Sequence, residues 1–208
     1  MDEYRTEEEQ AEAIKKWWNE NGKSIMAGIV IGITAIFGLR AYDGHTAQQA
    51  EAASILYEQM LIASRANDTE NMGIYANRII DDYKTSSYAI FATLMLAKIA
   101  AETGDLEQAE THLRWVLKNN SQEEFGHVAR LRLARVLISG NKLDLATDTL
   151  QVSEPGDFFA RYEELRGDIF VKQNKTAEAR QAYQKALANT AETGQSILQM
   201  KLDNLGRI

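Results

Sequence analysis

The clearest hydrophobic pattern in the chain is a run of sixteen uncharged residues, SIMAGIVIGITAIFGL, between Lys23 and Arg40. As an α-helix the run spans roughly 24 Å, and the flanking basic side chains can extend toward both interfaces of a hydrocarbon core about 30 Å thick. The run therefore predicts a transmembrane anchor over residues 24–41, after an N-terminal tail over residues 1–23. A buried core helix and a cleaved signal peptide are the alternatives. The long acidic region before the run is unlike the start of a signal peptide.

Charges beside the run predict its orientation. Lys15, Lys16 and Lys23 precede it, whereas Arg40 on the other side is soon followed by Asp43. Basic residues close to a span stay in the cytoplasm, and nearby acidic residues count little in this rule. We therefore expect a single-pass membrane protein with a cytoplasmic N-terminus and a domain over residues 42–208 on the other side of the membrane.

Small residues recur every four positions within the run, at Ser24, Gly28 and Gly32. Such a ridge lets two helix backbones approach closely in lipid, where packing drives association. The pattern predicts a helix-packing surface for another membrane helix. The alternative is that glycine is simply tolerated in membrane spans.

After the anchor, apolar and small residues recur at helical spacing without any sustained alternating pattern, which predicts an all-α domain. The helices form a repeat with shifts of 37 and then 33 residues. Its small packing residues are Ala97, Ala134 and Gly167 in the first helix, and Ala109, Ala146 and Ala179 in the second. Between them lie Gly104, Asn141 and Asn174, residue types that adopt the left-handed backbone conformation of a tight turn at low cost.

This pattern resembles the tetratricopeptide repeat, a helical hairpin of about 34 residues that stacks into a solenoid. The match covers residues 88–190, and it departs from the consensus in lacking the early Trp and the final Pro and in carrying Arg166 where a leucine is usual. Residues 44–85, with a turn at Asn67, predict one more, degenerate hairpin. Residues 195–205 predict a terminal helix that caps the solenoid.

Composition narrows the function. The formal net charge is −7, which argues against a nucleic-acid-binding face, and the absence of cysteine excludes disulfides and cysteine metal sites. His45, His112 and His127 show no metal-ligand spacing, and the chain has neither a phosphate-binding loop nor a nucleophile motif. We therefore expect no catalytic residue, no cofactor and no metal, and we expect that the protein is not an enzyme.

A binding groove is a more plausible site, because tetratricopeptide domains bind partners on a concave wall built from the first helix of each hairpin. By repeat phase the candidate groove residues are Phe91, Leu94, Lys98, Val128, Leu131, Arg135, Arg161, Glu164, Asp168 and Lys172. The wall would be apolar at one end and mixed in charge at the other. The alternative is that Phe91, Val128 and Leu131 belong to the core.

The whole chain is similar in sequence and in the order of its segments to the YfgM family. The similarity lies in the segment EAIKKWWNENGKSIMAGIVIG, in LRLARV at 131–136, in ELRGD at 164–168 and in the closing QMKLDNL. The resemblance implies a single-pass protein of the bacterial inner membrane whose domain over residues 42–208 is periplasmic. It also implies a non-enzymatic scaffold that accompanies the Sec translocon and cooperates with the membrane-anchored periplasmic chaperone PpiD on unfolded, emerging secretory proteins. The alternative function is a membrane-tethered regulatory adaptor whose acidic cytoplasmic tail binds a stress-response regulator.

Overall fold

The computed structural model describes residues 7–206, with the side chains of 9–191 and 194–206, and every regular element in this range is a helix. The all-α prediction is confirmed. The helices are α1 (Glu7–Arg65), α2 (Thr69–Asp82), α3 (Ser87–Glu102), α4 (Leu106–Asn119), α5 (Glu123–Ser139), α6 (Leu143–Thr149), a 3₁₀ turn η1 (Gly156–Phe158), α7 (Phe159–Lys172), α8 (Thr176–Ala188) and α9 (Glu192–Asn204). The chain divides into two compact units, Met1–Glu51 and Ala52–Ile208.

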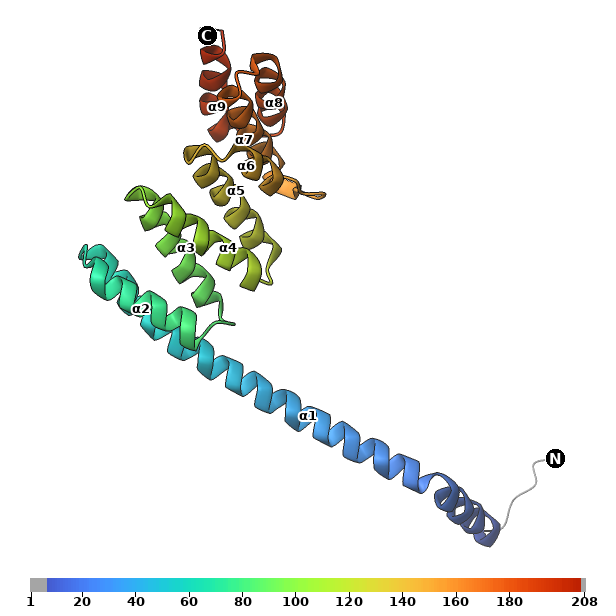
Figure 1. Cartoon of the computed structure of the whole chain (residues 1–208). Coiled ribbons are helices and arrows are strands. Elements are labelled where there is room, and N and C mark those ends of the chain that lie inside the picture. Colours follow the sequence, from blue (N-terminus) through green and yellow to red (C-terminus); the bar gives the residue numbers. More distant parts are fainter. Residues whose placement is uncertain (1–6, 207–208) are drawn as a thin grey trace, which may run out of the picture. The chain divides into compact units, whose positions relative to one another are not determined.

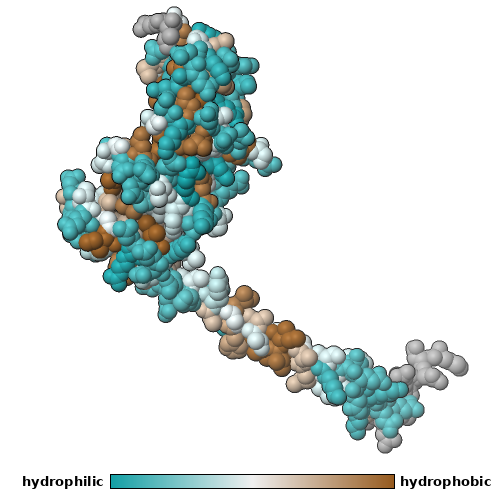
Figure 2. Space-filling model, in the orientation of Figure 1, coloured by the Kyte–Doolittle hydropathy of each residue, from teal (hydrophilic) through white to brown (hydrophobic). Residues whose placement is uncertain are grey.

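The first unit contains the apolar run, inside helix α1. Among the described helices, α1 is the one long and apolar enough to cross a membrane, and none of its apolar window is buried. Figure 2 shows the run as a hydrophobic band around α1. Met26, Ile31 and Phe37 are 51%, 69% and 67% exposed, so the alternative of a buried core helix is wrong. Helix α1 continues without a break past residue 41, and the boundary at 41/42 between anchor and domain stays a prediction.

The second unit is a stack of four helical hairpins and a final helix (Figure 1). The first helices of the hairpins are residues 52–65 of α1, α3, α5 and α7, which we call the A helices. The second helices, α2, α4, α6 and α8, are the B helices. Buried apolar residues fill the hairpins and the spaces between them, and Leu198, Leu202 and Leu205 of the last segment cover the final hairpin. The predicted degenerate hairpin and the capping helix are both confirmed.

All four hairpins turn in the same way. Asn67, Asn141 and Asn174 have φ angles of 56°, 56° and 59°, and Gly104 has 83°. The predicted left-handed turn positions are thus confirmed, and Asn67 extends them to the degenerate hairpin. In the first two hairpins an aspartate follows the turn and caps the B helix, as when Asp105 accepts a 3.0 Å bond from the Gln108 N–H.

The first hairpin shows where the solenoid begins. Ile55 and Ile62 are 57% and 51% exposed. Ala92 and Ala129, which occupy the repeat position of Ile55 in α3 and α5, are fully buried because each A helix there packs on the preceding B helix. Within the second unit no hairpin precedes the first one, so its apolar stacking positions remain open to solvent.

Candidate functional site

The exposed side of the A helices, which we call the A-helix face, carries most of the predicted groove residues. Lys98, Arg135, Arg161 and Lys172 are exposed, and Phe91, Val128, Glu164 and Asp168 are partly buried. Leu94 and Leu131 are instead buried in the core, 7% and 3% exposed. These two leucines therefore support the wall from behind, and the binding role of the other positions stays a prediction.

An apolar hollow of about 280 Å³ lies on this face between α3 and α5. We call it the apolar pocket. Its lining residues are Ala97, Lys98, Ala101, Glu102, Leu113, Arg132, Arg135 and Val136. Alanine, leucine and valine form the floor, while the charged side chains stand around it. The pocket therefore joins an apolar interior to a rim that contains two of the predicted groove residues.

A second hollow of about 370 Å³ lies between α5, α7 and the start of α9, and we call it the mixed pocket. Arg135 lines both hollows, so they adjoin at this side chain. Arg161 and Glu164 of α7 line the mixed pocket with Asp157. The hollow beside α3 thus has an apolar floor, and the hollow beside α7 has a lining of mixed charge.

The acidic residues at the far end of the predicted wall are bound by the capping helix. Lys201 of α9 donates to Glu164 Oε1 at 2.7 Å and to both oxygens of Asp168, at 2.6 and 2.8 Å. Tyr183 of α8 also donates its hydroxyl to Asp168 Oδ1 at 2.7 Å. Burial, and then the adjacent Asp168 carboxylate, raise the pKa of Tyr183 far above its usual value. Glu164 and Asp168 therefore hold α9 in place.

Aromatic rings connect three successive A helices. Phe91 of α3 stands edge-on to Phe125 of α5 at 5.2 Å between ring centroids. Phe91 also lies 6.1 Å from Tyr57, and Tyr57 lies 5.5 Å from Tyr88. All four rings are partly exposed, so they form an apolar patch that stabilises the stack and leaves surface open.

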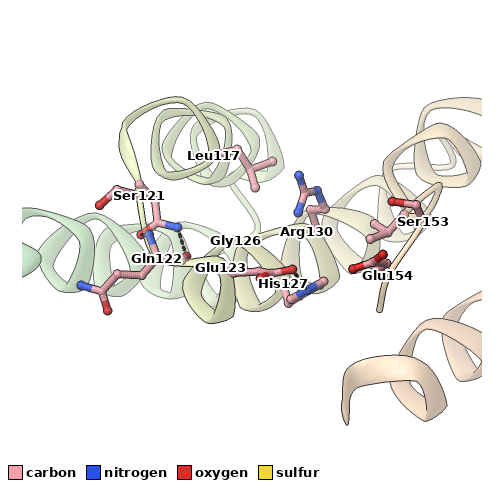
Figure 3. Close-up of a pocket in the computed structure, with 11 residues that line it drawn as sticks. Leu117, Ser121, Gln122, Glu123, Gly126, His127, Arg130, Ser153 and Glu154 are labelled. Atoms are coloured by element: carbon pink, nitrogen blue, oxygen red, sulfur yellow. Dashed lines mark hydrogen bonds and ion pairs between the residues drawn. The ribbon is translucent and has the colours of Figure 1, made fainter. Parts of the chain in front are cut away.

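A further hollow of about 380 Å³, the loop pocket, lies on the edge of the stack where the α4–α5 turn and the segment 152–154 approach α5 (Figure 3). Arg130, Glu123 and Glu154 give it a mixed, mostly polar lining. A Cβ built on Gly126 would lie 3.6 Å from the Arg130 guanidinium, which is an ordinary van der Waals contact. The pocket is suited to polar contacts.

His127, the most buried histidine, lines the loop pocket. Its Nδ1 lies 2.9 Å from the Tyr162 hydroxyl, and its Nε2 lies 3.6 Å from Glu123. The ring stacks on Phe158 at 4.9 Å. Through Tyr162 and Phe158, His127 thus connects α5 to the start of α7. Neither contact pairs the histidine with a serine nucleophile.

Among the side chains that the structure describes, those of 9–191 and 194–206, no group of three histidine or acidic residues could hold a metal ion. The apolar pocket has a charged rim and an apolar floor, and the other two hollows have linings of mixed polarity. The arrangement on the A-helix face can bind an apolar side chain and a neighbouring charged group.

Several residues of this face could have been found by extending the repeat register. Ala101 occupies the position of Ile138 and Val171, so a small residue there indicates a hollow. Tyr88 and Phe125 also share one repeat position. The role of Lys201 had no such indication, because α9 lies outside the repeat.

Comparison with known proteins agrees with this architecture. A family model described as a tetratricopeptide repeat-like domain matches residues 15–207, so the chain is a tetratricopeptide repeat-like protein. Three relatives are each named ancillary SecYEG translocon subunit. The protein from Haemophilus influenzae is 32% identical over 96% of this chain and 97% of its own length, and the one from Aggregatibacter actinomycetemcomitans is 33% identical over the same shares. The one from Escherichia coli is 29% identical over 99% of both chains.

This chain belongs to the family of ancillary SecYEG translocon subunits. The resemblance to the YfgM family is thereby confirmed. Ancillary translocon subunits and tetratricopeptide-like folds are non-catalytic kinds of protein.

Proposed function

We propose that this protein is a non-enzymatic, membrane-anchored scaffold that associates with the Sec translocon. The similarity to ancillary SecYEG translocon subunits over 96% of the chain carries the proposal. The exposed apolar run of α1 supports a single span in the inner membrane. Lys15, Lys16 and Lys23 support a cytoplasmic N-terminus and a periplasmic tetratricopeptide-like domain.

In this proposal the A-helix face holds a segment of a partner protein. Its two adjoining hollows and its partly exposed aromatic rings support a peptide-binding role. The partners that the family resemblance implies are the membrane-anchored chaperone PpiD and unfolded secretory proteins leaving the translocon.

Site-specific crosslinking in the full chain tests this role. A photoreactive residue is placed in turn at Lys98, Ala101 and Arg135, with a control at Gln181, which is exposed on α8. We expect adducts with the chaperone or with a nascent secretory protein at the three positions of the A-helix face and none at the control. Equal labelling at Gln181, or no adducts at the face, would count against the proposal.

Because the chain has no cysteine, its orientation can be tested with single introduced thiols. Asn19→Cys and Gln181→Cys are treated in intact cells with a maleimide that cannot cross the inner membrane. We expect labelling of Gln181→Cys in intact cells and of Asn19→Cys after permeabilisation only. The reverse pattern would place the domain in the cytoplasm.

The span contributes to the proposal through Ser24, Gly28 and Gly32. All three are exposed on α1, and nothing lies within 4 Å of a Cβ built on either glycine. We propose that this ridge packs against a translocon helix. Replacing both glycines by leucine should reduce co-purification with the translocon, and unchanged co-purification would remove the ridge from the proposal.

The regulatory-adaptor alternative depends on the acidic N-terminal tail. Asp2 and Glu3 lie outside the described residues, while Glu9 and Glu12 lie in the first turns of α1. Deleting the tail separates the two functions. A changed stress response with intact translocon association would favour the adaptor.

A further inference from the structure

We infer that the A-helix face selects extended peptide segments in which an apolar side chain is followed closely by an acidic one. The apolar side chain enters the apolar pocket and the carboxylate pairs with Arg135. This inference rests on the proposed role of the A-helix face and specifies the chemistry of its ligand.

The apolar pocket exists because one repeat position is underfilled. Ala101 of α3 corresponds to Ile138 in α5 and to Val171 in α7, and both larger side chains pack against the core of their hairpins. The alanine leaves an open hollow of about 280 Å³ above Leu113 and Val136. A branched or aromatic ligand side chain can enter this space and lose its contact with water.

The rim of this pocket is basic, although the whole chain is acidic. Lys98, Arg132 and Arg135 stand around it against one carboxylate, Glu102, in a protein of formal net charge −7. Lys98 lies 3.7 Å from Glu102, so these two charges largely offset each other. Arg132 points a guanidinium nitrogen at the Leu94 carbonyl, 3.4 Å away.

Of the three basic residues around the apolar pocket, Arg135 is the one for which no partner has been described so far. Among the described side chains, no carboxylate forms an ion pair with Arg135 or with Arg161, the next arginine along the face. The carboxylate of Glu164, which lines the mixed pocket with them, is bound by Lys201 of α9. A guanidinium binds a carboxylate with paired hydrogen bonds, so a free arginine between two hollows favours an acidic ligand group.

A factorial peptide array tests the inference with the full chain in detergent. Each peptide has a Gly/Ser frame, one variable position holding Leu, Phe or Ser, and a second holding Glu, Gln or Lys at increasing separations. We expect strongest binding for Leu or Phe followed at short distance by Glu. Replacing the apolar residue by Ser should weaken binding about tenfold or more, and Glu by Gln about two- to fivefold.

Two variants separate this site from other surfaces. Ala101→Ile should abolish the preference for Leu and Phe. Isoleucine already occupies the corresponding position of α5, so the fold tolerates it there. Ala177→Ile, at an exposed position of α8, should not change the preference. Arg135→Glu should change the preferred charge from Glu to Lys, whereas Arg180→Glu should leave it unchanged.

Three outcomes would overturn the inference: equal binding of Glu, Gln and Lys peptides, a preference for Lys, and binding that Ala101→Ile leaves intact. If crosslinking at Lys98, Ala101 and Arg135 still traps a partner, the proposed function survives such a result and only the ligand chemistry is wrong. Failure of both experiments would remove the binding role itself.

Discussion

The ring of Tyr183 in α8 lies directly against Gly167 in α7, so close that a Cβ built on the glycine would be 2.3 Å from ring atom Cε1. These two positions recur through the repeat as Ala97 with Leu113 and as Ala134 with Leu150. The last hairpin therefore combines a larger residue on its B helix with a smaller one on its A helix. The summed side-chain volume at this contact is nearly the same in the three hairpins, although the residue contributed by each helix differs.

This contact predicts that Gly167→Ala has opposite effects on the free energy of unfolding in the original protein and in a Tyr183→Leu variant. Gly167→Ala should lower the free energy of unfolding by about 1–2 kcal/mol, because the overpacking cost exceeds the gain of about 1 kcal/mol in helix propensity. In a Tyr183→Leu background the same substitution should raise it by about 1 kcal/mol. Urea unfolding of the full chain in detergent, followed by circular dichroism, measures the cycle. An equal effect in both backgrounds would contradict the packing argument.

Tyr183 also predicts a loss of stability at high pH. Its pKa is raised in the folded protein by burial and by Asp168, so the folded state keeps the proton above about pH 10, where an unfolded tyrosine releases it. The stabilisation is complete below the unfolded pKa and decreases as pH rises above it, by at most about 1.4 kcal/mol per pH unit. Tyr183→Phe should show a shallower decline in alkaline melting experiments. Burial also raises the pKa of Tyr162, so some decline remains, but equal slopes would refute the assignment.

Lys201 is predicted to attach the capping helix. It joins Glu164 and Asp168, and all three side chains are about one-quarter exposed. Lys201→Met leaves two partly buried carboxylates close together, which should cost about 1–3 kcal/mol. Hydrogen exchange should show faster exchange across α9 and little change in α3 and α4. Lys185→Met, at an exposed position of α8, is the matched control and should leave the hydrogen exchange of α9 unchanged.

Arg166, the departure from the tetratricopeptide consensus, is explained by the short helix that precedes it. Helix α6 ends at Thr149, and Arg166 donates at 3.0 Å to the free carbonyl of Leu150 while pairing with the buried Glu163. Restoring the usual residue with Arg166→Leu should therefore destabilise the protein by about 3 kcal/mol, because Glu163 would be buried without a cation. Adding Glu163→Gln should recover part of this loss in melting experiments. No recovery would mean that the carbonyl contact dominates.

The repeat could be predicted from the sequence because its small residues and turns recur at fixed spacing. Ala97, Ala134 and Gly167 are all buried as expected, and Gly104 and Asn141 adopt the expected left-handed turns. These features depend on local sterics, which a single residue type reports directly.

Which residues are exposed in the groove was harder to predict. The position of a residue in the repeat indicates the side of the helix on which it lies, but not how deeply its side chain is buried. Leu94 and Leu131 occupy the predicted phase, yet both are buried in the core cluster. The ion pairs of Lys201 join residues more than thirty positions apart, and no local pattern reports such a contact. Whether one helix joins the apolar run to the first hairpin was not predicted from the sequence. The structure has a continuous α1 there, in which Gly44 is accommodated.

The turn residues give a prediction that distinguishes backbone strain from side-chain contacts. Asn141 has a φ of 56°, and residues with a Cβ adopt this conformation at a cost of roughly 1–2 kcal/mol unless they can form local hydrogen bonds. Asn141→Ala should therefore lower the melting temperature clearly, whereas Asn141→Gly should leave it nearly unchanged. Asn119→Ala and Asn119→Gly, at the helical end of α4, should show the opposite order, because glycine is the poorer helix former. If Ala and Gly behaved alike at residue 141, the left-handed turn would not be what selects asparagine there.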